Sequence, residues 1–370
     1  MSDWQPICVL PNVELQFSIG CEFAALVPSH DGRVEELRRR HPLFHDFLSR
    51  FSDNFGNRIE PAVILVKSGA DCRYYSVDAV SSFRDAISIA TIALGWANKL
   101  RTPHTHPILF GDIFNIYPWM IDRNYRDLIG NTFAFTAIDE VTRFAGQCSP
   151  SIFRRTVSEW EIDRKLLAVL LEHWEKYYES EESEWKDIAL IRSLGTAFHA
   201  TSLPSTTNIT LYDFGPIVSL WVSAFEILAH PGSGGISNIE KVLGILEATP
   251  WHNNECGDRK FILGGKNKTE RPIVSYLYKR LYDCRNNFVH GNPISYNDVL
   301  VPASKRHIFE YAAPLYRIML TSFLNLQYRK EEPPVEDATA FGRYIGEYIE
   351  FYEAQGAVEK AILTAAPQDQ

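Results

Sequence analysis

The chain has 370 residues and a net charge of −9, with 45% hydrophobic and 22% charged residues. This composition is typical of an ordinary soluble globular protein with room for two domains. The charge excludes a global basic field that would attract nucleic acid, although a local basic patch is enough to hold a few phosphates.

The sequence also bears on the cellular compartment. The longest uncharged runs, 86–98 and 214–225, are shorter than the ~18 residues that a membrane span needs. The first residues lack a basic start followed by an apolar core, so no signal peptide is expected. The six cysteines are scattered without a C-x-x-C pair, which is typical of reduced thiols. We therefore expect a cytoplasmic protein with no membrane partner.

Residues 1–150 have a mixed character. Runs of β-branched and aromatic residues bounded by Pro, Gly and Asn predict strands at 6–20, 61–68, 106–121 and 131–139. Between these runs, the segments 33–51 and 82–100 are predicted to be helices. We therefore expect an α+β N-terminal domain over 1–150, whose role the sequence does not indicate.

From about residue 155 the pattern becomes almost wholly helical. Apolar residues at three- and four-residue spacing predict helices at 159–180, 185–200, 215–230, 237–248, 272–290, 303–328 and 338–363. The segments 201–208 and 330–337 are predicted to be a hinge and a linker. The expected organisation is thus an α+β domain, a mainly α-helical region over 155–330 and a C-terminal helix over 338–366.

The predicted helix at 272–290 carries two packing faces. Pro272 suits the first turn of a helix, and Gly291 marks its end. At about 100° per residue, one narrow stripe forms the expected core face, with Leu277, Leu281, Cys284 and Phe288. A second, semi-polar stripe lies about 100° away, with Tyr278, Tyr282, Arg285 and Val289. We expect this second stripe to face a partner helix and to form a homodimer interface.

The last turn of this helix gathers Arg285, Asn286 and His290 just before Gly291. Asn286 and His290 are four residues apart, so they are neighbours on one ridge, nearly opposite the core face. A histidine at a helix end is often explained by its favourable interaction with the helix C-terminus. The adjacent arginine, the asparagine on the same ridge and the second packing face favour a functional site instead.

The run RNNFVHG, 285–291, resembles the R-x4–6-H motif of HEPN domains, in the form found in Apea-like HEPN proteins. The apolar helix GPIVSLWVSAFEIL upstream, with its embedded Glu226, and the helix after the motif are also similar to that family. The resemblance covers about 205–330, a third of the chain. It implies a small HEPN-like helical bundle in which two subunits dock with both motifs facing one cleft.

Many HEPN proteins are metal-independent ribonucleases in toxin–antitoxin, antiviral or other stress systems. Carried over to this sequence, the resemblance implies Arg285 and His290 as catalytic residues and Asn286 as the polar residue beside the arginine. RNA would be the substrate, the protein would be a homodimer, and a regulatory or antitoxin partner would be possible. No cofactor and no metal are implied.

The spacing of arginine and histidine alone is weak support. The same interval occurs three times, at Arg40/His45, Arg101/His106 and Arg285/His290. The first pair is interrupted by Pro42 and the second lies in the loop RTPHTHP. Only the third pair follows a long helical pattern and ends at a glycine, so it is the one we expect to be functional.

Arginine and histidine suit the cleavage of RNA, which supplies its own nucleophile as the 2′-OH. Histidine exchanges protons near neutral pH, because its unperturbed pKa is about 6.5. Arginine offers a planar fork that matches the oxygens of a phosphate and neutralises charge that develops there. This chemistry needs no metal ion.

The segment that leads into the motif is locally basic. Residues 257–285 contain eight Lys and Arg against three acids, a charge of +5 in a chain of −9. Within it, ILGGKNKTE is a Gly- and Lys-bearing loop. We expect Lys266, Lys268 and Lys279 to bind substrate phosphates, although a solvated loop explains the same run.

Two other classes of function remain open from the sequence. The first is a non-catalytic HEPN bundle that binds nucleotides or RNA, or that acts as a dimerisation scaffold. The second is a metal-dependent hydrolase centred on His104 and His106, with Asp112 as the nearest third ligand. His252 and Cys256 form a single four-residue pair, which is too little for a zinc site.

Overall fold

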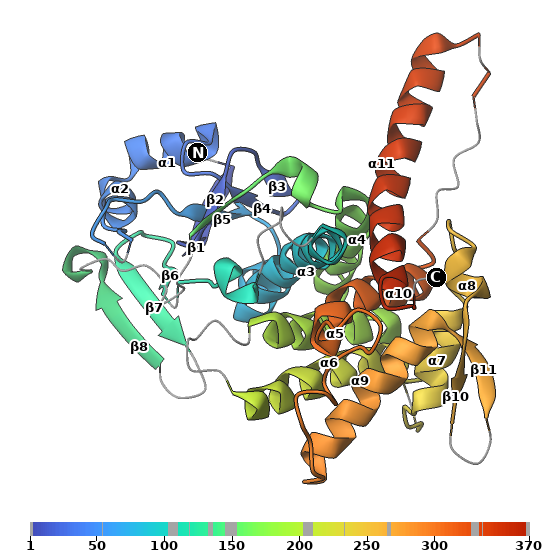
Figure 1. The fold of residues 1–370 in the computed structure, drawn as a ribbon. Coiled ribbons are helices and arrows are strands. Elements are labelled where there is room, and N and C mark those ends of the chain that lie inside the picture. Colours follow the sequence, from blue (N-terminus) through green and yellow to red (C-terminus); the bar gives the residue numbers. More distant parts are fainter. Residues whose placement is uncertain are drawn as a thin grey trace. The chain divides into compact units, whose positions relative to one another are not determined.

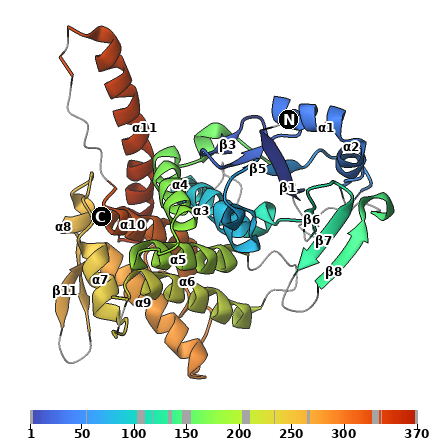
Figure 2. The ribbon, with the colours of Figure 1, turned by 180° about the vertical axis from the view of Figure 1, so that it is seen from behind.

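The computed structural model describes residues 3–53, 55–102, 110–117, 119–131, 136–144, 154–202, 210–232, 234–264, 268–326, 333–334 and 336–367. The chain is a mixture of helices and small sheets (Figure 1, Figure 2). It divides into two compact units that alternate along the sequence. Unit 1 comprises 1–88, 110–161 and 171–184, and unit 2 comprises 89–109, 162–170 and 185–370.

This division differs from the single boundary predicted near residue 150. Two helices, α3 (Val77–Arg101) and α4 (Arg164–Glu179), each contribute residues to both units. Sequence reasoning placed the boundary where the composition changes from mixed to helical. Compactness depends instead on which residues pack together, and the C-terminal part of α4 packs within unit 1.

Unit 1 is built on a four-stranded antiparallel sheet in the order β1 (Trp4–Leu10), β5 (Ala62–Lys67), β4 (Ala24–Val27) and β3 (Ile19–Gly20). The helix predicted at 33–51 is two helices, α1 (Gly32–Arg40) and α2 (Pro42–Ser49). Proline lacks a backbone donor and disfavours helical backbone in the residue before it. Pro42 therefore ends α1 and begins α2.

The remaining strands of unit 1 form two smaller sheets. A short strand β2 (Val13–Leu15) pairs in parallel with β9 (Arg155–Val157), and β6 (Met120–Ile121), β7 (Asp127–Asn131) and β8 (Thr136–Glu140) form an antiparallel sheet. Of the strand predicted at 106–121, only its last two residues are a strand among those that the structure describes, as β6. A 3-10 turn, η2 (Gly111–Phe114), occupies its middle, because Gly and Asp favour turns over strands.

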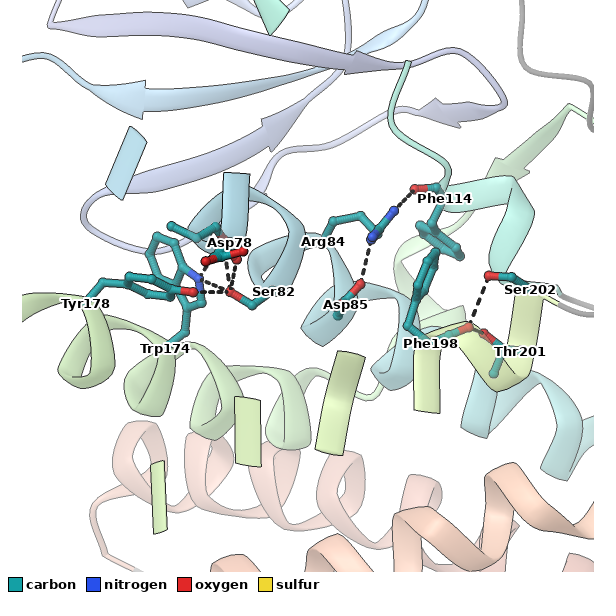
Figure 3. A network of polar contacts seen from close by, with 11 residues as sticks. Asp78, Ser82, Arg84, Asp85, Phe114, Trp174, Tyr178, Phe198, Thr201 and Ser202 are labelled. Atoms are coloured by element: carbon teal, nitrogen blue, oxygen red, sulfur yellow. Dashed lines mark hydrogen bonds and ion pairs between the residues drawn. The ribbon is translucent and has the colours of Figure 1, made fainter. Parts of the chain in front are cut away.

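An aromatic core and a buried polar cluster stabilise unit 1. Phe44, Phe47 and Phe51 are almost fully buried against the sheet residues. In the polar cluster, the Trp174 indole donates to the Ala79 carbonyl at 2.9 Å, and the Ser82 hydroxyl lies 3.0 Å from that of Tyr178 (Figure 3). These contacts join the unit 1 parts of α3 and α4.

Unit 2 is mainly helical, as predicted. Its elements are α5 (Trp185–Ser202), η5 (Leu211–Asp213), α6 (Phe214–Leu228), α7 (Ile239–Glu247), α8 (Glu255–Asp258), α9 (Ile273–Val289), η6 (Ile308–Tyr311), α10 (Ala312–Leu324) and α11 (Ala338–Leu363). A hairpin of β10 (Lys260–Leu263) and β11 (Thr269–Pro272) precedes α9 and was not predicted. Helix α6 packs against both α5 and α9.

A buried polar network attaches the C-terminal half of α11 to unit 2. Arg317 of α10 donates to Asp163 at 2.9 Å and to Gln355 of α11. The Gln355 amide donates to Glu359 at 2.6 Å, and Glu359 accepts from the backbone of His252 at 3.0 Å. The buried residues of α11 all lie between Phe351 and Ile362, so its first half projects from the helices around it (Figure 1).

Candidate functional site

Helix α9 positions the residues of the motif. Of its expected core face, Leu277, Leu281 and Cys284 are buried, and Phe288 is half-buried. Helix α6 runs antiparallel to it: a Cβ atom on Gly215 would lie 3.2 Å from Phe288, and the Phe225 ring lies 5.1 Å from that of Tyr278. Gly215 thus allows a close approach of the two helices beside the last turn of α9.

The end of α9 is a Schellman motif. Gly291 has a φ of +70°, which glycine adopts without a steric penalty. The Asn292 N–H donates to the Asn287 carbonyl at 2.9 Å, and the Gly291 N–H donates to the Phe288 carbonyl at 3.4 Å. The predicted end of the helix is confirmed, and the turn that carries His290 has a defined backbone.

His290 is the C-cap residue directly after α9, and it is exposed. Its backbone N–H donates to the Asn286 carbonyl at 3.0 Å. Among the described residues, neither the imidazole of His290 nor the amide of Asn286 has a side-chain hydrogen bond. The helix end therefore presents an imidazole and an amide together, four residues apart, and leaves both available to a ligand.

Arg285 is held on α9 by two contacts. Its Nη2 atom donates to Oε1 of Glu226 on α6 at 3.1 Å, and its guanidinium lies over the Tyr282 ring at 4.7 Å from the ring centre. The side chains of Arg285 and Glu226 are 22% and 29% exposed. The guanidinium is therefore partly accessible, but its position is fixed by a carboxylate and an aromatic face.

Burial changes the electrostatics around this ion pair. It raises the pKa of Glu226, although the positive charge of Arg285 acts in the opposite direction. Burial also holds the pKa of Tyr278 well above its ordinary value, and the charge of Glu226 adds to that effect. Among the described residues, the buried Tyr278 hydroxyl has no hydrogen-bond partner. The pair thus occupies a partly desolvated environment, in which charges interact more strongly than in water.

The structure does not bring the side chains of Arg285 and His290 together within one chain. Helical side chains point toward the N-terminus, so Arg285 extends back over Tyr282, while His290 lies one and a half turns further on. The two residues are separated by roughly 140° around the axis and by roughly 7.5 Å along it. The contacts of Arg285 with Glu226 and Tyr282 thus direct its guanidinium toward the start of α9 rather than toward His290.

The predicted dimer stripe is only partly at the surface. Tyr278 is 0% exposed, because its ring packs against Phe225 inside the chain. Its inclusion as an interface residue is therefore corrected. Tyr282 is half-buried, and Val289 is 57% exposed. The stripe thus changes along α9 from a core face at its start to a surface at its end.

The predicted phosphate-binding lysines differ in their surroundings. Lys279 forms an ion pair with Asp283, at the (i, i+4) spacing of a helix. Lys268 is exposed, with no ion pair among the described residues. Lys266 lies outside the described residues. Of the other basic residues in this segment, Arg271 is paired with Glu240 and Glu247, so the local positive charge is largely offset.

The sequence did not predict the ion pair between Arg285 and Glu226. An acid inside the apolar run of α6 was the available signal, since a half-buried carboxylate usually has a charged partner. His104 and His106, the centre of the alternative metal site, lie in the segment 103–109, outside the described residues. Within the described ranges, no group of three or more His, Cys, Asp or Glu residues is arranged to hold a metal ion.

One segment among the described residues, Leu211–Leu228, is long and apolar enough to cross a membrane, and half of it is buried within the protein. Its buried residues include Phe214, Val218 and Trp221, which belong to the core of unit 2. Such an apolar, half-buried segment is expected of a central helix in a bundle.

Comparisons of this chain with protein-family models, with curated proteins and with solved structures found no match.

Proposed function

We propose that this protein is a metal-independent endoribonuclease of the HEPN type that acts at the C-terminal end of α9. The observation that carries the proposal is the exposed imidazole of His290, held at a defined helix end beside Asn286. A histidine that served only the packing of unit 2 would be buried with Leu281 and Cys284. This one is directed away from the core and has no side-chain hydrogen bond within the described part of the chain.

The proposed reaction transfers the phosphate within the RNA strand. The 2′-oxygen attacks the adjacent phosphorus as its proton passes to a base, and the bond to the 5′-oxygen breaks as that oxygen receives a proton. His290 takes part in this proton transfer, and Arg285 neutralises the charge on the phosphate oxygens. Asn286 contacts the phosphate or orients His290. The products are a 2′,3′-cyclic phosphate and a 5′-hydroxyl.

The position of Arg285 supports a site completed by two chains. Within one chain its guanidinium is turned toward Glu226 and Tyr282 rather than toward His290. We propose a homodimer in which the ends of two α9 helices meet, so that one phosphate lies among two histidines and two arginines. A toxin-like role in antiviral defence or stress, with a regulatory or antitoxin partner, follows from the resemblance of the motif to HEPN proteins.

A second candidate function is a non-catalytic scaffold that binds RNA or nucleotides or that mediates dimerisation. The ion pair between Arg285 and Glu226 favours it, because the carboxylate competes with phosphate for the guanidinium. In a scaffold, Arg285 would join α6 to α9 and His290 would have no role in proton transfer.

Incubation of the purified protein with total RNA, with and without EDTA, distinguishes the two functions. For the ribonuclease we expect EDTA-insensitive cleavage that leaves 2′,3′-cyclic phosphate ends. His290→Ala is expected to abolish cleavage without loss of stability, and Arg285→Lys to impair it severely, because a point charge does not replace a planar fork. His45→Ala, at another exposed histidine, is the matched control.

If His290→Ala and Arg285→Lys both cleave RNA at the wild-type rate, the ribonuclease site is not at the end of α9. The scaffold is then the function that this helix supports. Cleavage abolished by EDTA would instead indicate a metal-dependent hydrolase.

A further inference from the structure

Two exposed tyrosines lie on similar tight turns, one directly before α6 and one shortly after α9. Tyr212 is 77% exposed in the turn Thr210–Asp213, and Tyr296 is 59% exposed in the turn Ser295–Asp298. Each turn begins with a hydroxyl residue and ends with an aspartate three positions later. Neither side chain packs in the core of unit 2, so both rings are available to a ligand.

The turn of Tyr296 is rigid. Both the N–H and the hydroxyl of Ser295 donate to Oδ2 of Asp298, each at 2.7 Å. Arg280 of α9 donates to the carbonyls of Asp298 and Leu300, at 3.3 and 2.7 Å. These hydrogen bonds connect the turn to α9. The backbone at Tyr296 therefore loses little conformational entropy when a ligand binds.

The turn of Tyr212 is closed in the same way. The N–H and the hydroxyl of Thr210 donate to Oδ2 of Asp213, at 2.5 and 2.9 Å. Helix α6 begins directly after this turn, and its Gly215 packs against Phe288 of α9. Tyr212 is three residues from Gly215, a distance of at most about 11 Å along the chain. Tyr296 follows His290 by six residues. Both tyrosines thus lie on short segments that adjoin the two helices in contact at the end of α9.

We propose that Tyr212 and Tyr296 stack on unpaired bases of a single-stranded RNA on either side of the phosphate bound at His290. This inference rests on the proposed function and adds its substrate class. Every base offers a π-face, so aromatic platforms bind single strands with little dependence on sequence. The carboxylate in each turn disfavours phosphate close to the tyrosine, so the base is the part of the nucleotide that suits these positions.

The surroundings fit RNA better than a second copy of the chain. The core of a protein interface is depleted of charged residues and packs a continuous patch. Here the turns that carry the two rings are mainly polar, with Thr210 and Asp213 beside Leu211 in one turn and Ser295, Asn297 and Asp298 in the other. Amide and hydroxyl groups beside an exposed ring match the edges of an unpaired base.

Fluorescence anisotropy with a labelled 2′-O-methyl oligonucleotide measures this binding without cleavage, because the methyl group blocks the nucleophile. Tyr212→Ala and Tyr296→Ala are each expected to weaken the affinity at least about 5-fold. Tyr212→Phe and Tyr296→Phe are expected to retain it, since the π-face remains. The control is Phe55→Ala, which removes an exposed ring in unit 1, and RNA duplex is expected to bind more weakly than the single strand.

Equal affinity of the alanine variants and the wild type, in a protein that cleaves RNA, would overturn the stacking inference and leave the proposed function intact. A wild-type protein that neither cleaves RNA nor binds the oligonucleotide would overturn both. A change of oligomeric state in the alanine variants with unchanged affinity would assign the tyrosines to a contact between copies and also overturn the inference.

Discussion

The guanidinium of Arg285 lies 3.1 Å from the carboxylate of Glu226 and over the ring of Tyr282, so it points along α9 away from His290. The resemblance of the motif implied that the arginine and the histidine act on one phosphate. The contacts instead hold Arg285 beside Glu226 and Tyr282, where the carboxylate competes with a phosphate for its guanidinium.

Glu226→Gln is expected to raise the affinity for single-stranded RNA about 5-fold, because the charge that competes with phosphate for Arg285 is removed. The measurement is anisotropy with the uncleavable oligonucleotide. Glu255→Gln, which breaks the ion pair of Arg259 with Glu255 in unit 2, is the matched control and is expected to leave the affinity unchanged. An unchanged affinity in Glu226→Gln would mean that Arg285 does not bind the RNA.

The same variant has an expected pH dependence. Burial raises the pKa of Glu226 in the folded protein, so the stability contributed by its protonated form is present below the unfolded pKa and lost as the pH rises through the folded pKa. Glutamine mimics the protonated form. Denaturant unfolding at pH 4 and pH 7 should therefore show Glu226→Gln gaining stability relative to the wild type at the higher pH. The opposite trend would show that Arg285 outweighs the cost of burial.

Val289→Asp is expected to convert the proposed homodimer to a monomer, because it places a charge at the exposed end of the second stripe of α9. Val289 is 57% exposed, so the free energy of unfolding of the monomer should change little. Sedimentation measures the oligomeric state. Ile262→Asp, at a 66% exposed residue of the β10–β11 hairpin, is the control, and dissociation by this variant alone would place the interface there.

Lys268→Glu is expected to weaken RNA binding and to reduce its dependence on salt, because fewer counterions are released from the RNA. Lys279→Glu is expected to do the same to a smaller extent, since Asp283 already neutralises part of its charge. Titrations at several salt concentrations measure both slopes, with Lys360→Glu at an exposed position of α11 as the control. Identical slopes in all variants would make these lysines ordinary surface residues.

Gly291→Ala is expected to lower the free energy of unfolding by about 1 kcal/mol, because alanine is strained at a φ of +70°. A Cβ atom at this position would meet nothing within 4 Å, so the cost is purely conformational. Gly244→Ala in α7, where a Cβ atom also has open space, is expected to stabilise the protein by about 0.5–1 kcal/mol. Chemical denaturation measures both, and equal signs would contradict the assigned backbone conformations.

Much of the secondary structure is determined by the sequence alone, because it depends on local periodicity and on capping. The apolar stripe of α9, its start after Pro272 and its end at Gly291 agree with the structure. Pro42 is a local signal for the break between α1 and α2, although the prediction treated 33–51 as one helix. The prediction failed where weak turn signals compete with apolar runs, as in the strand expected at 106–121.

Only the tertiary structure decided which faces are buried and which charges are paired. Periodicity placed Tyr278 and Val289 on one stripe, but the neighbouring α6 buries the first and leaves the second at the surface. The sequence grouped Arg285 with His290 because they are close along the chain. The guanidinium of Arg285 lies toward Tyr282 because helical side chains lean toward the N-terminus and because Glu226, 59 residues away, is its ion-pair partner. Such pairings depend on contacts between distant residues, which no local pattern encodes.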